Sequence, residues 1–247
     1  MKKKRKFRTW IVVVFLLICL FGVIYNSYKI ISWKLNVNEN KKIKNSIDKS
    51  IKIINNKKDK GIRYEIDFDT LVLRNPDTVA YLKVNNTNID YVVVKGKNNE
   101  YYLTHNYEKK WNVAGWVFGD YRNKFDGNDK NLIIYGHNTK DGSMFETLIN
   151  VLDKKWYTNN ENHIITLVTK KDTYNYQVFS TYSIIAEDYY ITTSFNNNTF
   201  NKFINTLKKR SIFDYNIDVD NDDKILTLSS CIGDGTKRVV LHAKLID

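Results

Sequence analysis

The stretch TLSSCIGDGTKRVVLHAK, near the C-terminus, brings a thiol, a guanidinium and an imidazole within a dozen residues, at Cys231, Arg238 and His242. The chain has one other cysteine, Cys19. A cysteine can be a buried apolar residue, half of a disulfide, a metal ligand or a nucleophile. Its unperturbed pKa of about 8.5 leaves the thiol mostly protonated at neutral pH, and a nearby positive charge favours the nucleophilic thiolate. Cys231 is therefore a candidate nucleophile if Arg238 lies beside it.

The segment IGDGTK between these residues favours a hairpin, because two glycines flank an aspartate. A hairpin that closes symmetrically places Cys231 opposite Arg238, with Cβ atoms about 5 Å apart. A guanidinium there could also stabilise an oxyanion during attack on a carbonyl. On these two residues alone, an ordinary surface arginine beside a core cysteine is the simpler interpretation.

Such chemistry also needs a general acid and base, and four histidines are available. The same hairpin pairs His242 with Thr227, about 13 Å from the sulfur and too far to act on it. His163 follows NNEN and is expected to be solvated, while His105 lies in a polar loop. His137 follows the hydrophobic run NLIIYG, and the ends of core strands hold reacting groups rigidly. His137 is the predicted partner of Cys231.

The N-terminus has the composition of a membrane anchor. Six cations in MKKKRKFR precede twenty uncharged residues, from Thr9 to Tyr28, enough for one helix to cross a hydrocarbon core of about 30 Å. No small-residue cleavage site follows, so a retained anchor is expected, with a cytoplasmic tail at residues 1–8 and the remaining chain outside. These six cations are half of the net charge of +12, so the charge does not indicate a nucleic-acid partner.

The position of Cys19 inside the anchor restricts the role of Cys231. As the only cysteine of the presumed outer domain, Cys231 has no partner there for an intramolecular disulfide. A structural zinc site would also lack the thiols that it needs. The remaining interpretations are a buried apolar residue and a nucleophile.

The rest of the chain is predicted to be mainly β. Residues 29–60 are rich in lysine and asparagine, with isoleucines at helical spacing (Ile43, Ile47, Ile51 and Ile54), which indicates a helical stalk or a solvated linker before a domain at 61–247. Two helices are expected, at 143–155 and 198–210. Eight segments rich in β-branched and aromatic residues predict a barrel or sandwich: 79–84, 89–96, 114–120, 131–136, 163–169, 173–185, 224–230 and 237–246.

Three motifs together resemble the sortases, and class B in particular. YGHNTKDGSMF is followed 94 positions later by TLSSC and then by RVVLHAKL. The family has its cysteine in a TLxTC-like motif, its histidine in a GH motif at a strand end and its arginine on the next strand; here Ser230 replaces the usual threonine. The resemblance covers roughly residues 60–247 and includes NPDTVAYLKV and a helix between the sixth and seventh strands. It implies an eight-stranded β-barrel with peripheral helices.

The resemblance also implies a reaction. Cys231 would attack the carbonyl that joins threonine to the next residue of an NPxTx or (S/N)PxTG-like sorting motif in a secreted protein, forming a thioester. His137 would act as general acid and base, and Arg238 would hold the substrate carbonyl and oxyanion. An amine of a peptidoglycan precursor or stem peptide would then take the acyl group. Ser229 is expected to line the substrate groove, and no metal or cofactor is expected.

Two other classes of function fit parts of the sequence. One is a different secreted cysteine peptidase or transpeptidase, although papain-like enzymes place cysteine before histidine and the SHGC-like signature of L,D-transpeptidases is absent. The other is a membrane-tethered β-barrel binding module with an inert Cys231. The run NPDTV, from Asn75 to Val79, resembles a sorting signal, but a helix-to-strand junction is the favoured interpretation.

Overall fold

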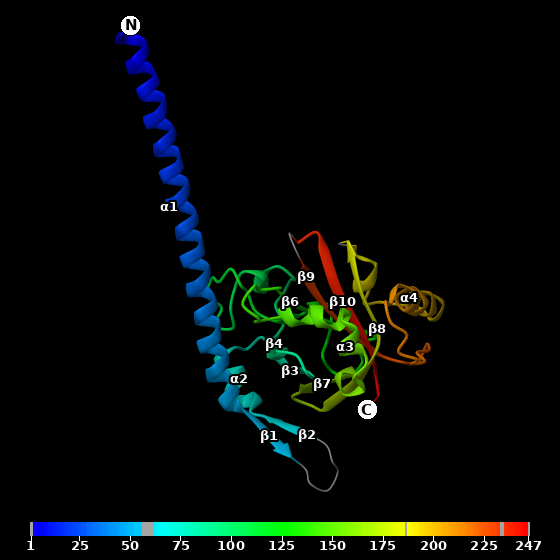
Figure 1. Cartoon of the computed structure of the whole chain (residues 1–247). Coiled ribbons are helices and arrows are strands. Elements are labelled where there is room, and N and C mark those ends of the chain that lie inside the picture. Colours follow the sequence, from blue (N-terminus) through cyan, green and yellow to red (C-terminus); the bar gives the residue numbers. More distant parts are fainter. Residues whose placement is uncertain (1, 56–61, 186, 233–234, 247) are drawn as a thin grey trace.

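The computed structural model describes residues 2–55, 62–185, 187–232 and 235–246. Side chains are described for these residues except 2–8, 55, 62, 197, 231 and 232. A long N-terminal helix extends away from a β-barrel, and a shorter helix covers the opposite side of the barrel (Figure 1). The predicted architecture, mainly β with an N-terminal helix that could span a membrane, is confirmed.

The barrel closes in the order β10-β8-β7-β3-β4-β5-β6-β9. Most neighbours are antiparallel, but β6 runs parallel to β9, and β4 runs parallel to β5. Seven of the eight strands match the predicted segments closely, whereas the segment at 114–120 forms only a two-residue strand. The strands are β3 (Thr78–Val84), β4 (Asp90–Val94), β5 (Phe118–Gly119), β6 (Asn131–Gly136), β7 (Ile164–Thr169), β8 (Thr173–Ile185), β9 (Ile225–Ile232) and β10 (Lys237–Leu245).

Apolar side chains form two cores. The larger one fills the barrel and includes Leu82, Val92 and Leu228, each fully buried. The second core joins α4 (Asn197–Arg210) to the outer face of β8 and β10. The predicted stripe on this helix is confirmed as core packing, because all four of its members are buried: Phe200, Phe203, Ile204 and Leu207.

Other helical elements differ in detail from the sequence prediction. The helix expected at 143–155 is a 3₁₀ segment, η3 (Glu146–Leu152), followed by one α-turn, α3 (Lys154–Tyr157). The predicted junction at NPDTV is confirmed, since α2 (Phe68–Arg74) ends at Asn75 just before β3. The remaining short elements are η2 (Tyr101–Leu103), η4 (Asn160–His163) and η5 (Tyr189–Ile191).

The N-terminal helix α1 runs from Lys2 to Ile47 without interruption. It contains an apolar window long enough to cross a membrane, and this window is fully exposed in the structure. The helical spacing predicted for the segment after the anchor is correct for Ile43 and Ile47, which are buried on α1. It is wrong for Ile51 and Ile54. After η1 (Asp48–Ser50), these β-branched residues lie in β1 (Ile51–Asn55), which pairs with β2 (Ile62–Ile66).

A buried histidine lies in the wall of the barrel. His242 on β10 is fully buried, with its Nδ1 2.8 Å from the Thr227 hydroxyl and its Nε2 2.9 Å from the Tyr182 hydroxyl. Burial disfavours the charged imidazolium and lowers the pKa of His242 to about 3. The unfolded chain binds this proton near pH 6.5, so the folded state loses stability as the pH falls from 6.5 toward 3.

We therefore expect His242→Gln to flatten the decline of stability in acid. Below pH 6.5 the wild-type chain should lose up to about 1.4 kcal/mol per pH unit through this one group, and the variant should not. The measurement is the thermal unfolding midpoint of both chains in the same detergent between pH 7.5 and 5.0. Parallel curves for the two chains would contradict the expectation, because every other titrating group is common to both.

Candidate active site

Strand register brings the three predicted site residues into one row. In the parallel ladder between β6 and β9, Gly136 pairs with Ser230, so the next residues, His137 and Cys231, continue the row from adjacent strands. In the antiparallel ladder between β9 and β10, Cys231 pairs with Arg238, as the hairpin geometry predicted. The side chain of Cys231 lies outside the part that the structure describes.

A cleft of about 250 Å³ opens beside this row. It lies at the ends of β6 and β9, where the chain leaves the barrel wall. Most of the surface that lines it is apolar, and the lining residues come from six segments of the chain: Asn99, Leu103, Phe118, Tyr135, Gly136, His137, Glu187, Asp188, Tyr190, Ile191, Ser229 and Arg238. The cleft has the mixed apolar and polar character of a peptide-binding site.

A backbone carbonyl fixes the tautomer of neutral His137, that is, which ring nitrogen carries the proton. Its Nε2 lies 2.7 Å from the carbonyl oxygen of Leu103, and a carbonyl can only accept a hydrogen bond. The proton of the neutral imidazole therefore resides on Nε2, which leaves Nδ1 as the basic nitrogen. Partial burial of the ring leaves one side of it open to the cleft.

Gly115 packs directly against this histidine. Its φ is +56°, a conformation that favours glycine. A Cβ at this position would lie 2.3 Å from the carbonyl oxygen of Tyr102, 2.8 Å from that of Leu103 and 3.0 Å from Cδ2 of His137. The backbone of residue 115 thus forms one wall of the space that the imidazole occupies.

The guanidinium of Arg238 is held at the rim of the cleft. Its Nη1 donates to the carbonyl of Gly235 and, at 3.0 Å, to that of Lys237. A guanidinium carries five N–H donors, so anchoring one nitrogen on the hairpin leaves donors for a bound molecule. The side chain is half-buried, which strengthens its interaction with negative charge compared with full exposure.

Ser229 is buried beneath the cleft, with 3% of its surface exposed. Its hydroxyl lies 3.1 Å from the hydroxyl of Tyr190, which is also buried. The alternative of a plain surface serine is therefore wrong. Both residues line the cleft, so their hydroxyls are polar groups within a mainly apolar wall.

A buried carboxylate supports another part of the wall, and the sequence reasoning missed it. Asp120 accepts hydrogen bonds from Arg122, from the Tyr135 hydroxyl at 2.8 Å and from the Asn99 amide at 2.9 Å. Burial alone would raise the pKa of Asp120, but these hydrogen bonds outweigh it and lower the pKa. The ionised carboxylate fixes Tyr135 and Asn99 in the lining. The available signal was the acidic residue that ends the run AGWVFGD.

The other histidines lie elsewhere. His242 pairs with Thr227, as predicted, within the barrel wall. His105 stacks on the ring of Tyr101. The expectation that His163 is solvated is wrong: 7% of its surface is exposed, and burial among aromatic rings lowers its pKa. Its neighbours on the chain are polar, but Trp156, Tyr157 and Tyr215 enclose it in three dimensions.

Known proteins are similar to this chain both in sequence and in fold. A family model described as a sortase domain matches residues 82–246. Sortase B of Listeria monocytogenes is 38% identical over 178 residues, which cover 70% of this chain and 71% of that protein. The chain belongs to the class B sortases. Sortase B of Staphylococcus aureus is 30% identical over 251 residues, covering 100% of this chain and 99% of that protein.

Solved structures of class B sortases agree with the barrel. Sortase B from B. anthracis has a TM-score of 0.74 at 29% identity and covers 86% of this chain and 99% of its own. A Staphylococcus aureus sortase B–substrate complex has a TM-score of 0.68 at 34% identity, covering 73% and 84%. The predicted class and the prediction of a cysteine transpeptidase are confirmed.

The contact between Gly115 and His137 predicts a selective loss of activity. We expect Gly115→Ala to reduce transpeptidation by about 100-fold, because a methyl group there must displace the carbonyls of Tyr102 and Leu103, and the Leu103 carbonyl holds the imidazole. Initial rates on a sorting peptide measure the effect.

Gly142→Ala is the matched control, since Gly142 also has a positive φ, +82°, yet its Cβ would meet no atom closer than 3.6 Å. It carries the same backbone strain without the clash, so it should retain most activity. Equal losses in the two variants would show that strain, and not displacement of His137, is responsible.

Proposed function

We propose that this sortase cleaves an NPxTx or (S/N)PxTG-like motif after its threonine and joins the protein to an amine of cell-wall peptidoglycan. The observation that carries this proposal is the row of residues 137, 231 and 238 across three adjacent strands, at the edge of a cleft. Such a row supplies a nucleophile, a proton carrier and a fixed positive charge at one point. These are the groups that acyl transfer through a thioester requires.

The first half-reaction forms the thioester. The Cys231 thiolate attacks the carbonyl carbon of the motif's threonine, and the bond from that carbon to the nitrogen of the next residue breaks as the tetrahedral intermediate collapses. The His137 imidazolium gives its Nδ1 proton to the departing amine, while Nε2 keeps its hydrogen bond to the Leu103 carbonyl. That hydrogen bond supports this role, because it holds the ring in one orientation while Nδ1 gives up its proton.

The second half-reaction reverses the proton movement. An incoming amine attacks the thioester carbonyl and gives a proton to Nδ1 of His137, and the thiolate of Cys231 leaves. The products are a new amide and the original thiolate–imidazolium pair, so no proton is lost or gained overall. A thioester retains enough free energy for this transfer, provided that the cleft favours the amine over water.

Arg238 stabilises the charge that develops on the substrate oxygen in both halves. Its Nη1 stays on the hairpin carbonyls, and its other N–H groups face the oxyanion. Ser229 contacts the bound peptide from the floor of the cleft, where Tyr190 holds its hydroxyl. The Staphylococcus aureus enzyme has been solved with a substrate, and a sortase B has been solved with triglycine, which presents a free amine.

The placement of the domain supports this substrate class. The N-terminal part of α1 can anchor the chain in the membrane, with residues 1–8 in the cytoplasm, 9–28 in the bilayer, 29–60 as a stalk and 61–247 as the catalytic domain outside. In Figure 1, the ends of β9 and β10 that bear Cys231 and Arg238 face the side toward which α1 extends. The cleft is therefore near the membrane, where secreted proteins and peptidoglycan precursors emerge.

The decisive test separates transfer from hydrolysis. We expect the full chain in detergent to convert an NPxTx peptide and an added amine into an amide-linked product. Cys231→Ala should abolish the product, because no other described thiol lies near the cleft. Mass spectrometry of the products distinguishes the outcomes. Hydrolysis at a rate that ignores the added amine would favour a peptidase instead.

A second test asks whether Cys231 is an accessible thiol in the folded protein. In a Cys19→Ala background, the methanethiosulfonate reagent MTSET should modify one thiol and remove activity. Staphylococcus aureus sortase B has been solved with this reagent. Modification only after denaturation would show an inert core cysteine, and activity unaffected by modification would exclude it as the nucleophile.

A further inference from the structure

The helix that continues from the anchor contacts the barrel through a buried amide. Asn40 of α1 has 3% of its surface exposed, among the apolar side chains of Val37 and Ile43. Its Nδ2 donates to the carbonyl of Gly115 at 3.0 Å and to Oδ1 of Asn112 at 3.3 Å. Its Oδ1 accepts from Nδ2 of Asn112 at 3.0 Å. These bonds are directional, so they fix how the turn at 112–115 sits against α1.

That turn leads directly to the histidine of the site. The backbone N–H of Asn112 donates to the carbonyl of Thr104 at 2.8 Å, and that of Trp116 donates to the carbonyl of Tyr102 at 3.0 Å. Between these two bonds lies Leu103, whose carbonyl holds the imidazole of His137. Gly115, the residue that Asn40 binds, also contacts the ring itself. Only one residue therefore separates α1 from the imidazole.

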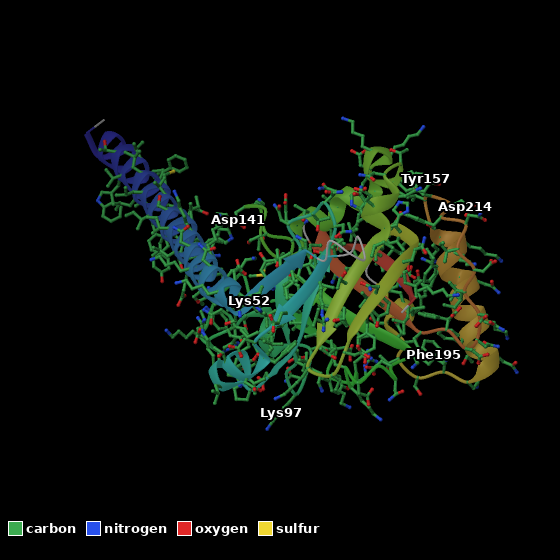
Figure 2. All side chains as sticks on the ribbon, turned by 90° about the horizontal axis from the view of Figure 1, so that it is seen from below. Lys52, Lys97, Asp141, Tyr157, Phe195 and Asp214 are labelled. Atoms are coloured by element: carbon green, nitrogen blue, oxygen red, sulfur yellow. The ribbon has the colours of Figure 1, made fainter. Side chains whose placement is uncertain are left out.

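The next residue of α1 holds the loop on the other side of His137. The ammonium of Lys41 approaches Oδ2 of Asp141 at 3.1 Å, and Asp141 lies beside α1 in Figure 2. Burial raises the pKa of Asp141, but a hydrogen bond from Ser143 and the Lys41 charge outweigh it and lower the pKa. The loop is closed by a bond from the N–H of Phe145 to the carbonyl of His137, at 2.9 Å.

We propose that the C-terminal part of α1, beyond the anchor, positions His137 for catalysis, with Asn40 acting through Gly115 and Lys41 acting through Asp141. This inference rests on the proposed role of His137 as acid and base. Asn40 and Lys41 touch no reacting atom, so they are positioning residues. Because α1 is one helix, the twelve residue steps from Tyr28 to Asn40 span about 18 Å, and the contact also ties the geometry of the site to the anchor.

The test compares Asn40→Ala with Asn38→Ala in the full chain in detergent. Asn38 is the same residue type two positions away, on the exposed face of α1, so it is a matched control. We expect Asn40→Ala to lower kcat about tenfold while KM for the sorting peptide changes less than twofold. NMR of ring-labelled histidine, assigned with His137→Gln, should show the His137 signals shifted in Asn40→Ala and unchanged in Asn38→Ala.

If Asn40→Ala does not fold, exchanging the charges of the Lys41–Asp141 ion pair tests the same proposal. Lys41→Glu should lower kcat and shift the His137 ring signals, and the double variant Lys41→Glu, Asp141→Lys should restore both. Unchanged ring signals and kcat in Asn40→Ala, with a lower melting temperature alone, would overturn the proposal, as would failure of the exchange to restore either quantity.

The two proposals fail in different ways. If His137→Gln retains activity, the assignment of the acid and base is wrong, whatever the ring signals do. If His137→Gln is inactive while Asn40→Ala leaves the ring signals in place, the catalytic role survives and the positioning role does not.

Discussion

The parallel pairing of β6 with β9 is the constraint on which the site depends. The parallel ladder that pairs Asn131 with Ile225 continues without a shift to Gly136 and Ser230, so the paired stretch ends at the same level on both strands. A slip of one residue would turn every side chain of one strand to the opposite face of the barrel, exchanging apolar interior residues of β9 for polar ones such as Thr227 and Ser229. The buried residues on β9, such as Leu226 and Leu228, exclude that slip. Core packing therefore sets the separation of residues 137 and 231.

Two charged groups are held by very different surroundings near the cleft. Asp120 is buried and ionised because Arg122, Tyr135 and Asn99 all donate to it. Arg238 is half-exposed and rests on backbone carbonyls, which carry only partial negative charge. Its positive charge is therefore not cancelled by a neighbouring carboxylate in these contacts. A wall that holds a fully hydrogen-bonded carboxylate and a rim that presents a guanidinium suit a site that binds a peptide and then stabilises an anion.

Sequence reasoning reached the barrel because its strands are long, rich in β-branched residues and separated by polar turns. It reached the pairs Cys231–Arg238 and Thr227–His242 because a hairpin leaves few choices of register. It failed where distant segments decide the environment. His163 follows polar residues yet is enclosed by aromatic rings, and Ile51 leaves the helical pattern because a strand eleven residues further on pairs with it. Nothing in the sequence around Asn40 indicates its hydrogen-bond partners, Asn112 and Gly115, which lie more than seventy positions away.

The strand that makes the fewest backbone pairs in the described barrel, β5, lies next to the cleft. Strand β5 contributes only Phe118 and Gly119, with one backbone pairing to β4 and two to β6. Side chains supply much of the closure there: Phe118 packs on the ring of Tyr135, and the Trp116 indole donates to the carbonyl of Val92 at 2.8 Å. Backbone ladders resist shear along their whole length, whereas a few ring contacts yield more easily. Among the described strands, the one beside the cleft is therefore tied by the fewest ladder pairs, whereas β9 and β10, which carry residues 231 and 238, pair at eight positions.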